Sequence, residues 1–325
     1  METKETNSNE TVQKTVIRRY RNKKVKLIFN PKAGVAKPEV ASLEEIIDLM
    51  HKYHFEPEVF IIEPDADLAS NIKKALADGF DLFVACGGDG TSSSTARLLA
   101  GTGATLGIIP LGTQNNTALA YDIPADAHEA IRILREGRKL KVDLGQATVA
   151  GKTTNFVELC SVGLVSDLFP LADDIQHGNL FKTGELLKSL ANEKPSNFEI
   201  SLDTRKKPIV STGYVLLVAN MPVFGFNFRV GKRSAMQDGK LDVYFFKDAS
   251  KLELLSYVFR GMEGGLPQEK NILHILAKKV SVRVDPKMAI MYDDQPFGEG
   301  DVELSILKHA LTVMIPKNSR IKQII

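Results

Sequence analysis

The sequence lacks several features that would place it in a specialised class of protein. It has no tryptophan and only two cysteines, Cys86 and Cys160, so it defines no disulfide framework and fits a reducing compartment. No apolar run approaches the roughly 18 to 20 residues that a membrane-spanning helix needs. The polar start, METKETNSNETVQ, has no apolar core of the kind found in secretion signals. These absences predict a cytoplasmic protein that does not cross a membrane.

Charge of one sign is also scarce, with one exception. The formal net charge of +2 argues against a dedicated nucleic-acid-binding protein. Cations are concentrated between Lys14 and Lys26, where KTVIRRYRNKKVK contains seven of them and no acid. Such a run is either a solvated tail or a patch that attracts anionic lipid headgroups, each cation then adding about 1 kcal/mol near the surface. The segment by itself leaves both interpretations open.

What is present in the first half is an alternation of short apolar runs and amphipathic stretches. The predicted strands are 25–30, 58–62, 81–86 and 105–110, and the predicted helices are 38–53, 65–77, 92–100 and 127–135. Asp65 and Asp126 are placed to cap the second and fourth of these helices. Strands that alternate with helices indicate a parallel sheet covered on both faces.

The second half has a different rhythm. Strand-like segments follow one another with only one clear helix, 252–260, which favours an antiparallel sandwich. The segment GQATVAGKTT (145–154) approximates a P-loop but has five residues between its glycines where that motif has four, so we interpret it as a hairpin. The predicted organisation is a polar tail (1–23), an α/β domain (24–145) and a β-sandwich domain (146–325) whose last strand is free to return to the first domain.

The most informative stretch is VACGGDGTSSSTARLLAG (84–101), in which three glycines and an acid separate a strand from a helix. Gly87, Gly88 and Gly90 allow the backbone to approach a ligand closely, and successive N–H groups at a helix N-terminus attract phosphate. Asp89 is a poor neighbour for phosphate unless a cation or a substrate hydroxyl lies between them, which suggests Mg²⁺ or proton transfer. The alternative is a purely structural strand-to-helix turn.

Two further loops strengthen the case for a ligand site. NPKAG (30–34) follows the first strand and PLGTQNNTA (110–118) follows the fourth. In a parallel sheet these loops and GGDG open at the same edge, where ligands bind. His51 and His54 have spacing compatible with a metal, but further ligands are missing around them, so surface histidines are the simpler interpretation.

In this order the motifs resemble those of the diacylglycerol kinase catalytic family, which includes bacterial lipid kinases and the sphingosine and ceramide kinases. That family has NPxSG, GGDGT, PLGTxND, a DG-x-LDV segment and a late DGE. This chain has NPKAG, GGDGT, PLGTQNN, DGKLDV (238–243) and DDQP (293–296), so the resemblance extends from about residue 24 to 316. It implies an α/β nucleotide domain, as in NAD kinases and diacylglycerol kinases, followed by an antiparallel β-sandwich domain, with the active site between them.

The resemblance also implies roles for particular residues. ATP phosphates are expected to lie against the first three loops, lined here by Asn30, Lys32, Gly87, Gly88, Asp89, Gly90, Thr91 and Thr113. A structural Mg²⁺ is expected at Asp238, with backbone carbonyls near Ala235 and Lys240. Asp293 is the candidate to deprotonate a lipid hydroxyl, because Gln295 replaces the acid of the family's DGE and an amide cannot take up the proton. Asp89 is the second catalytic candidate. The alternative for 292–298 is a β-turn with solvated acids.

The chain also departs from the family pattern. Ser93 and Ser94 replace an Asn-Glu pair, and Asn116 replaces an aspartate. These changes remove negative charge where metal and phosphate are expected. Two hypotheses follow: an active ATP- and Mg²⁺-dependent lipid kinase, or a pseudokinase that binds nucleotide or lipid without chemistry. An NAD kinase shares the GGDG loop but fits the other motifs less well.

The expected acceptor is a lipid hydroxyl, on diacylglycerol, a phosphatidylglycerol-like headgroup or a sphingoid base. The segment MPVFGFNFRVGKR (221–233) either lines a lipid cleft or belongs to the sandwich core. Access to lipid would be peripheral, helped by the cations at 18–21. Nothing in the sequence fixes the oligomeric state, and a homodimer is compatible with it.

Overall fold

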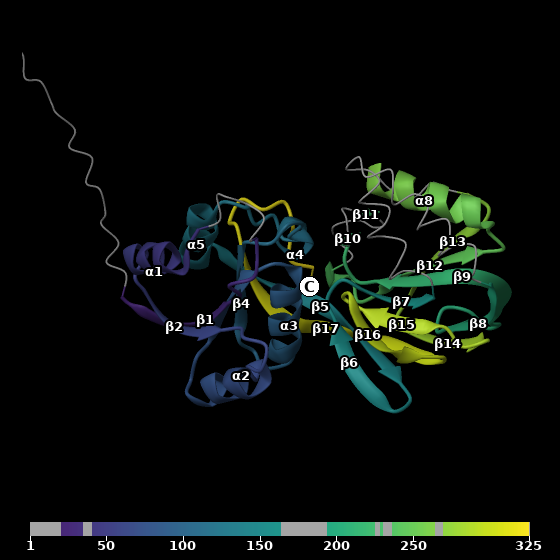
Figure 1. Ribbon diagram of the computed structural model, residues 1–325, viewed down its shortest axis with the longest axis horizontal. Coiled ribbons are helices and arrows are strands. Elements are labelled where there is room, and N and C mark those ends of the chain that lie inside the picture. The colour runs from purple at the N-terminus through teal and green to yellow at the C-terminus, as the bar shows by residue number, and fades with distance from the viewer. Residues whose placement is uncertain are drawn as a thin grey trace, which may run out of the picture.

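The fold is described from a computed structural model covering residues 21–34, 41–163, 194–224, 228–229, 236–263 and 269–324. Two sheet-based domains lie side by side, and long strands pass between them (Figure 1). The predicted fold class, an α/β domain followed by an antiparallel β-sandwich domain, is confirmed.

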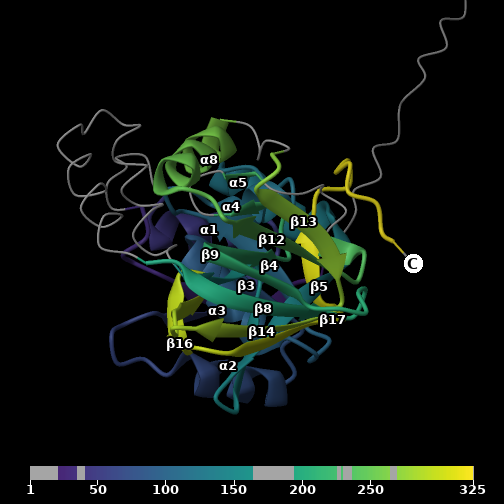
Figure 2. The same ribbon diagram turned by 90° about the vertical axis from the view of Figure 1, so that its right-hand side faces the viewer.

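The first domain is built on a parallel sheet with the strand order β2-β1-β3-β4. Its strands are β1 (Lys23–Phe29), β2 (Phe55–Ile61), β3 (Leu82–Gly87) and β4 (Thr105–Pro110). Every residue of β3 and β4 is buried, as expected for central strands covered on both faces. Helices α1 (Leu43–Lys52) and α5 (Ala127–Glu136) lie on one face, and α2 (Leu68–Ala77) and α3 (Asp89–Leu99) lie on the other (Figures 1 and 2).

The helix starts follow local capping chemistry. Ser42 and Glu45 form a reciprocal capping box at α1, and Asp126 caps α5 as predicted. Asp67, and not the predicted Asp65, caps α2. Helix α3 begins at Asp89 with Gly88 as its N-cap, three residues before the predicted start. The glycine-rich loop is therefore the first turn of the helix itself.

The second domain consists mainly of antiparallel strands. They are β5 (Arg138–Val149), β6 (Lys152–Phe156), β7 (Leu159–Gly163), β8 (Ser196–Leu202), β9 (Ile209–Ala219), β10 (Val223–Phe224), β11 (Phe228–Arg229), β12 (Leu241–Lys247), β13 (Ile272–Ala277), β14 (Lys279–Asp285), β15 (Ala289–Tyr292), β16 (Gln295–Glu299) and β17 (Val302–Ile315). Helix α8 (Lys251–Glu263) lies over the sheet beside β12 and β9, where a small apolar core includes Tyr244, Phe246 and Leu254 (Figure 2). Residues 145–154 lie in the β5–β6 hairpin, with Ala150 and Gly151 at positive φ, as predicted.

Strand β17 joins the two domains. Its first residues pair with β14 of the sandwich, and Thr312 and Val313 pair in parallel with β4 of the first domain. Strand β5 runs antiparallel to β17 along most of its length. One continuous sheet therefore passes through both domains and fixes how the loops at the end of β3 and β4 face the sandwich.

Helix length places a limit on how the described chain can meet a membrane. Among residues that the structure describes, no helix is long and apolar enough to cross one. The segment 221–233, considered above for lipid contact, lies largely outside the described residues, although Met221 is buried in the core of the first domain.

Candidate active site

The loop after β1 is tied to the glycine-rich loop by Asn30. Its Nδ2 donates to Oγ1 of Thr91 (3.2 Å), and its Oδ1 accepts from the backbone N–H of Lys32 (3.0 Å). The backbone N–H of Asn30 also donates to the carbonyl of Cys86 (3.0 Å) at the end of β3. Asn30 thus shapes its own turn and joins two of the predicted loops.

Two of the glycines of GGDG, Gly87 and Gly88, are required by close packing, whereas Gly90 has open space where a Cβ would lie. A Cβ on Gly87 would lie 2.4 Å from Oγ1 of Thr91, and a Cβ on Gly88 would lie 3.3 Å from the Cα of Gly112. A Cβ on Gly112 would in turn lie 2.5 Å from the Cα of Gly88. The backbone at the tips of β3 and β4 can be this close only because side chains are absent there.

Asp89 joins the second and third loops. Its two carboxylate oxygens accept the backbone N–H groups of Asn116 (3.0 Å) and Thr117 (2.9 Å). These residues begin α4 (Asn116–Ala120), a short helix that sequence reasoning missed because it is shorter than any pattern of apolar periodicity. Asp89 therefore has a structural role, and the two N–H groups that it accepts stabilise its negative charge in a loop that is otherwise suited to binding an anion.

The three loops enclose a cavity of about 450 Å³ that also contacts the second domain. Six predicted nucleotide residues line it, namely Asn30, Lys32, Gly88, Gly90, Thr91 and Thr113. The other two, Gly87 and Asp89, are not among the lining residues. Ile62 and Leu68 add an apolar side, and Gln295 contributes from the sandwich domain. The structure thus gathers the sequence-predicted loops around one space.

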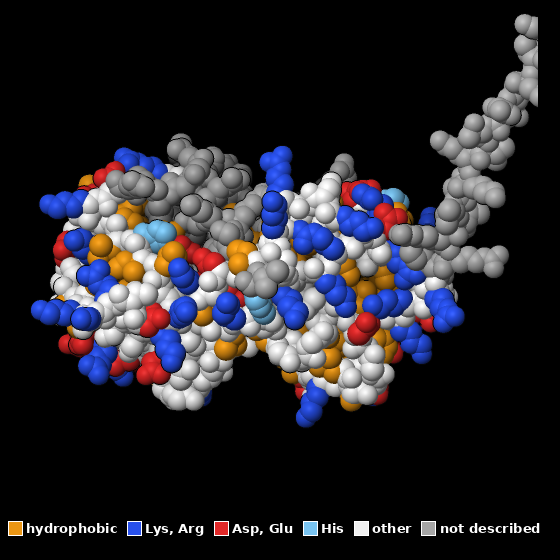
Figure 3. Space-filling model, turned by 180° about the vertical axis from the view of Figure 1, so that it is seen from behind, with side chains coloured by type: hydrophobic (Ala, Val, Ile, Leu, Met, Phe, Trp, Pro, Cys, Tyr) orange, Lys and Arg blue, Asp and Glu red, His pale blue; other side chains and the backbone are white. Residues whose placement is uncertain are grey.

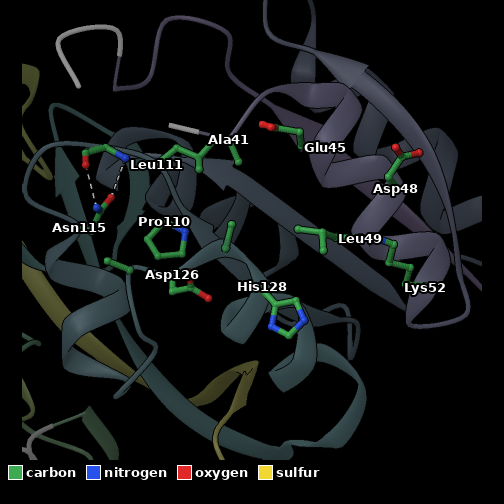
Figure 4. Close-up of a pocket in the computed structure, with 13 residues that line it drawn as sticks. Ala41, Glu45, Asp48, Leu49, Lys52, Pro110, Leu111, Asn115, Asp126 and His128 are labelled. Carbon is green, nitrogen blue, oxygen red and sulfur yellow. Dashed lines mark hydrogen bonds between the residues drawn. The ribbon is translucent and has the colours of Figure 1, made fainter. Parts of the chain in front are cut away.

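A larger cavity, of about 1080 Å³, lies on the other side of the loop after β4 (Figure 4). Asn115 holds this loop, because its Oδ1 accepts from the N–H of Gly112 (2.9 Å) and its Nδ2 donates to the carbonyl of Gly112 (2.8 Å). The carboxylates of Glu45, Asp48 and Asp126 line this second space, with Lys52 beside them. That arrangement is unfavourable for a polyphosphate, so the smaller cavity is the better candidate for nucleotide.

Asp293 is fully enclosed and fully hydrogen-bonded. Its oxygens accept backbone N–H groups from Val157 (2.8 Å), Glu158 (2.8 Å) and Leu159 (3.3 Å). Nη1 of Arg97, on α3, donates to Oδ2 (3.2 Å) and completes the set. Burial raises the pKa of Asp293, while these four donors oppose that effect. A carboxylate so occupied is at odds with the predicted role of proton acceptor and instead holds α3 and the second domain together.

Asp294, the next residue, has the opposite environment. Asp294 is exposed, it forms no hydrogen bond with any described residue, and it is next in the chain to Gln295, which lines the 450 Å³ cavity. Partial burial between the cleft walls, together with the nearby carboxylate of Asp89, raises its pKa. Both Asp293 (φ +41°) and Asp294 (φ +61°) lie in the left-handed region, in the two-residue turn between β15 and β16. The exposed acid of this turn is therefore one position later than the one chosen from the sequence.

Glu158 is a buried carboxyl group that sequence reasoning missed. Its Oε1 accepts from Oγ1 of Thr117 (3.1 Å), and only 4% of the residue is exposed. Burial raises the pKa of Glu158 well above its ordinary value, and the carboxylates of Asp89, Asp293 and Asp294 raise it further. An acid within the otherwise apolar run FVELC was the available signal.

Arg97 is the second missed residue. Besides Asp293, its guanidinium donates from Nη2 to Oγ of Ser94 (2.9 Å) and lies 5.2 Å from the centre of the Tyr292 ring. Ser94 lines the 450 Å³ cavity, whereas Ser93 is buried in the first domain. Where the family has an acid, this chain therefore has a hydroxyl held by an arginine.

The predicted metal site is described only in part, because Ala235 lies outside the described residues. Asp238 is half-buried, and its Oδ1 accepts the backbone N–H of Lys240 (3.0 Å). Burial raises its pKa, and the nearby carboxylates of Asp242 and Asp143 add to this effect. The described residues contain no group of three or more acid, histidine or cysteine side chains placed to bind a metal. A half-buried carboxylate in the negative field of two others is nevertheless the type of oxygen ligand that a hard cation takes.

Comparison with known proteins agrees with this geometry. The sequence profile of the diacylglycerol kinase catalytic domain matches residues 24–147, and that of the YegS C-terminal NAD kinase beta sandwich-like domain matches residues 172–315. Residues 24–147 therefore belong to the diacylglycerol kinase catalytic-domain family, and the two matches together span most of the chain. The predicted family resemblance and the predicted enzyme class, a lipid kinase, are confirmed.

Individual relatives are distant but match over most of their length. A diacylglycerol kinase from Bacillus subtilis (strain 168) is 27% identical over 306 residues, which cover 91% of this chain and 97% of the relative. One from Mycobacterium tuberculosis is 27% identical over 307 residues, covering 93% and 98%. The crystal structure of a diacylglycerol kinase from Bacillus anthracis str. Sterne aligns with a TM-score of 0.67 at 19% identity, covering 91% of this chain and 98% of that one. At that identity the structural likeness supports the fold alone.

Proposed function

We propose that this lipid kinase transfers the γ-phosphoryl group of ATP to a hydroxyl group of diacylglycerol or a related lipid. The observation that carries the proposal is the 450 Å³ cavity, where three loops of the first domain meet Gln295, the first residue of β16 in the second. Phosphoryl transfer depends on positioning and charge neutralisation, and a cleft between two domains can hold one substrate on each side.

In this proposal the triphosphate lies against the N-terminus of α3. Successive backbone N–H groups there and the helix dipole favour an anion, and Lys32 adds a full positive charge. The nucleoside is placed toward the apolar side formed by Ile62 and Leu68. Thr113 on the third loop supplies a hydroxyl next to the phosphates.

Mg²⁺ is proposed at Asp238, with backbone carbonyls near Ala235 and Lys240 as further oxygen ligands. When bound, such an ion supplies positive charge and stiffens the segment that holds it. The chain's own contribution is the turn itself: Oδ2 of Asp143 accepts the N–H of Gly239 (2.7 Å), and Oδ1 accepts that of His309 (2.7 Å). Asp143 thus anchors the Asp238 turn to the strands that join the domains.

The lipid is proposed to be reached from a membrane surface without insertion. A surface formed by β5, β17 and the C-terminal residues presents Lys139, Lys141, Lys308, Arg320 and Lys322, all exposed, and we call it the C-terminal basic surface. Lys and Arg side chains are numerous on the face shown in Figure 3. Anionic headgroups are the complementary chemistry.

The test is ADP formation in mixed micelles, with diacylglycerol, phosphatidylglycerol and sphingosine each offered separately and NAD offered as a soluble acceptor. We expect lipid-dependent ADP release with one of the lipids and none with NAD. Lys32→Met is expected to weaken ATP binding about tenfold, because it removes a charge that faces the phosphates. Lys52→Met, in the larger cavity, is the matched control and should bind ATP as the wild type does. Equal effects of the two variants, or acceptance of NAD, would contradict the proposal.

A further inference from the structure

The turn between β15 and β16 carries two adjacent aspartates that face in different directions. Asp293 and Asp294 are the central residues of a two-residue turn, with Tyr292 and Gln295 paired across its base. Positive φ at both positions is the geometry of the tight hairpin turns that aspartate and asparagine tolerate. The consequence is that the carboxylate of Asp293 is buried while Asp294 remains exposed.

The inward carboxylate has no capacity left for chemistry. The side chain of Asp293 is 2% exposed, and each of its oxygens already accepts two hydrogen bonds. A proton on either oxygen would compete with the two donors that the oxygen already accepts in a buried place, which is costly. Its place in the structure is that of an anchor.

The outward carboxylate has the properties that proton transfer needs. Asp294 is exposed, and no described residue donates a hydrogen bond to it. Burial raises the pKa of Asp294, and the nearby carboxylate of Asp89 raises it further. Its chain neighbour Gln295 lines the 450 Å³ cavity. Asp294 is therefore an exposed acid one residue from the wall of that cavity.

We propose that Asp294 accepts the proton of the lipid hydroxyl and that Arg97 and Asp293 position it; the inference rests on the proposed function. The hydroxyl oxygen forms a bond to the γ-phosphorus as the bond between that phosphorus and the β,γ-bridging oxygen breaks. The electron pair of the broken bond leaves with ADP. The hydroxyl proton passes to Asp294, which later returns it to solvent.

The positioning contacts explain how an exposed aspartate on a turn is held in one place. Arg97 reaches from α3 across the domain boundary to Asp293, while its second Nη holds Ser94 in the wall of the nucleotide cavity. The same guanidinium stacks against Tyr292, at the base of the turn. Nucleotide wall and turn are therefore fixed by one side chain.

The test is the single-turnover rate of phosphoryl transfer with the lipid that the wild type accepts. Asp294→Asn keeps the size and the left-handed preference of the residue but cannot take up a proton. We expect it to lower the rate by at least 100-fold, the usual size of a general-base effect, with the Kd for ATP within twofold of wild type. Asp248→Asn, another exposed aspartate at positive φ (+48°), is the control and should leave the rate unchanged.

The outcomes separate the two claims. A rate for Asp294→Asn within threefold of wild type would overturn the role of Asp294 and leave the lipid kinase proposal standing. If wild type transfers phosphate to no lipid, the proposed function fails and this inference fails with it. In the supporting case, the wild-type rate should also fall at low pH as Asp294 becomes protonated, and the residual activity of Asp294→Asn should lack that fall.

Discussion

The four carboxyl groups around the cleft have the same chemistry but different surroundings. Asp89 caps a short helix, Asp293 anchors a turn, Asp294 is exposed, and Glu158 is buried beside a single hydroxyl. The hydrogen-bond donors that each group receives decide whether its charge is stabilised. Of the buried groups among the four, Glu158 receives the fewest hydrogen bonds to offset its burial. Its protonation should therefore be visible in how the free energy of unfolding depends on pH.

Replacing Glu158 with glutamine should reveal this as a pH-dependent change in stability. The pKa of Glu158 is raised in the folded protein above its unfolded value of about 4.3. The folded state therefore binds the proton more tightly, and stability falls as pH rises from about 4.3 toward the folded pKa. Glutamine resembles the protonated acid and avoids that loss. Denaturant unfolding at pH 5.5 and 8.5 should show Glu158→Gln gaining on wild type at the higher pH.

The comparison between the two pH values provides its own control, because any change in packing acts equally at both. Between the unfolded and the folded pKa of Glu158, unfolding of the wild type releases a proton and unfolding of the variant does not. Over that range the difference in unfolding free energy between variant and wild type should grow by about 1.4 kcal/mol for each pH unit. A difference that is the same at pH 5.5 and 8.5 would show that Glu158 is ionised throughout and that Thr117 suffices to stabilise it.

At the scale of elements, helix α3 and the β15–β16 turn form one unit through Arg97. Arg97→Met leaves Asp293 buried with three amide donors and no cation, so we expect a loss of about 2 to 3 kcal/mol in unfolding free energy. We also expect the single-turnover rate to fall at least tenfold while ATP affinity is kept. The substitution frees the β15–β16 turn but leaves the backbone N–H groups at the start of α3 in place. Arg97→Lys should recover part of the rate, since it can reach Asp293 but cannot also hold Ser94.

A double-mutant cycle with Asp293→Asn measures this unit directly. If the two side chains act together, the double variant should be little worse than either single variant, with a coupling of about 0.5 to 3 kcal/mol. Arg132→Met is the matched control, because Arg132 pairs with Glu129 and Glu136 on the surface of α5 and should contribute little. Additive effects of Arg97 and Asp293 would contradict the account.

The elements also show what the sequence could reveal. Strands β3 and β4 were predicted within one residue, because fully buried parallel strands produce continuous apolar runs bounded by turns. The loops of the nucleotide cavity were predicted because glycine-bearing turns at the carboxyl ends of parallel strands are typical of ligand sites. Helix α4 was not predicted, because it is too short to show apolar periodicity. The contact between Arg97 and Asp293 was not predicted either, because it joins residues 196 positions apart in the chain.

The choice between two candidate proton acceptors illustrates a finer limit. Asp293 and Asp294 are chemically identical neighbours, and which of them faces inward depends on a hairpin register set by the pairing of β15 with β7 and β16. That register is a property of the assembled sheet, so no local pattern distinguishes the two residues. The roles of Asn30 and Asp89 as connectors between loops were hidden for the same reason.

At the scale of the whole molecule, the C-terminal basic surface predicts how the protein meets lipid. Lys139 and Lys141 lie on the same side of β5. The side chain of Gln323 accepts the backbone N–H of Lys141 and donates to its carbonyl. The side chain of Gln237 connects this region to the backbone of Lys322. The exposed cations of this surface are therefore held together by an ordered C-terminal segment.

Neutralising part of this surface should weaken binding to anionic vesicles. We expect the variant that combines Lys139→Gln, Lys141→Gln and Lys322→Gln to bind phosphatidylglycerol vesicles at least tenfold more weakly, as measured by co-sedimentation. Each cation adds about 1 kcal/mol near such a surface. The combined changes Lys206→Gln, Lys207→Gln and Lys278→Gln, all at exposed positions of the sandwich, form the control. Equal losses in both variants would show general charge attraction and no defined membrane-facing surface.

The central claim, transfer of phosphate to a lipid, is tested most directly by following the label of γ-³²P-ATP. The wild-type protein is incubated with labelled ATP, Mg²⁺ and mixed micelles, and the organic phase is then extracted. We predict label in a single lipid product, with unlabelled ADP formed in equal amount. Bound ATP with no label in any offered lipid would contradict the account and would favour a protein that binds nucleotide without chemistry.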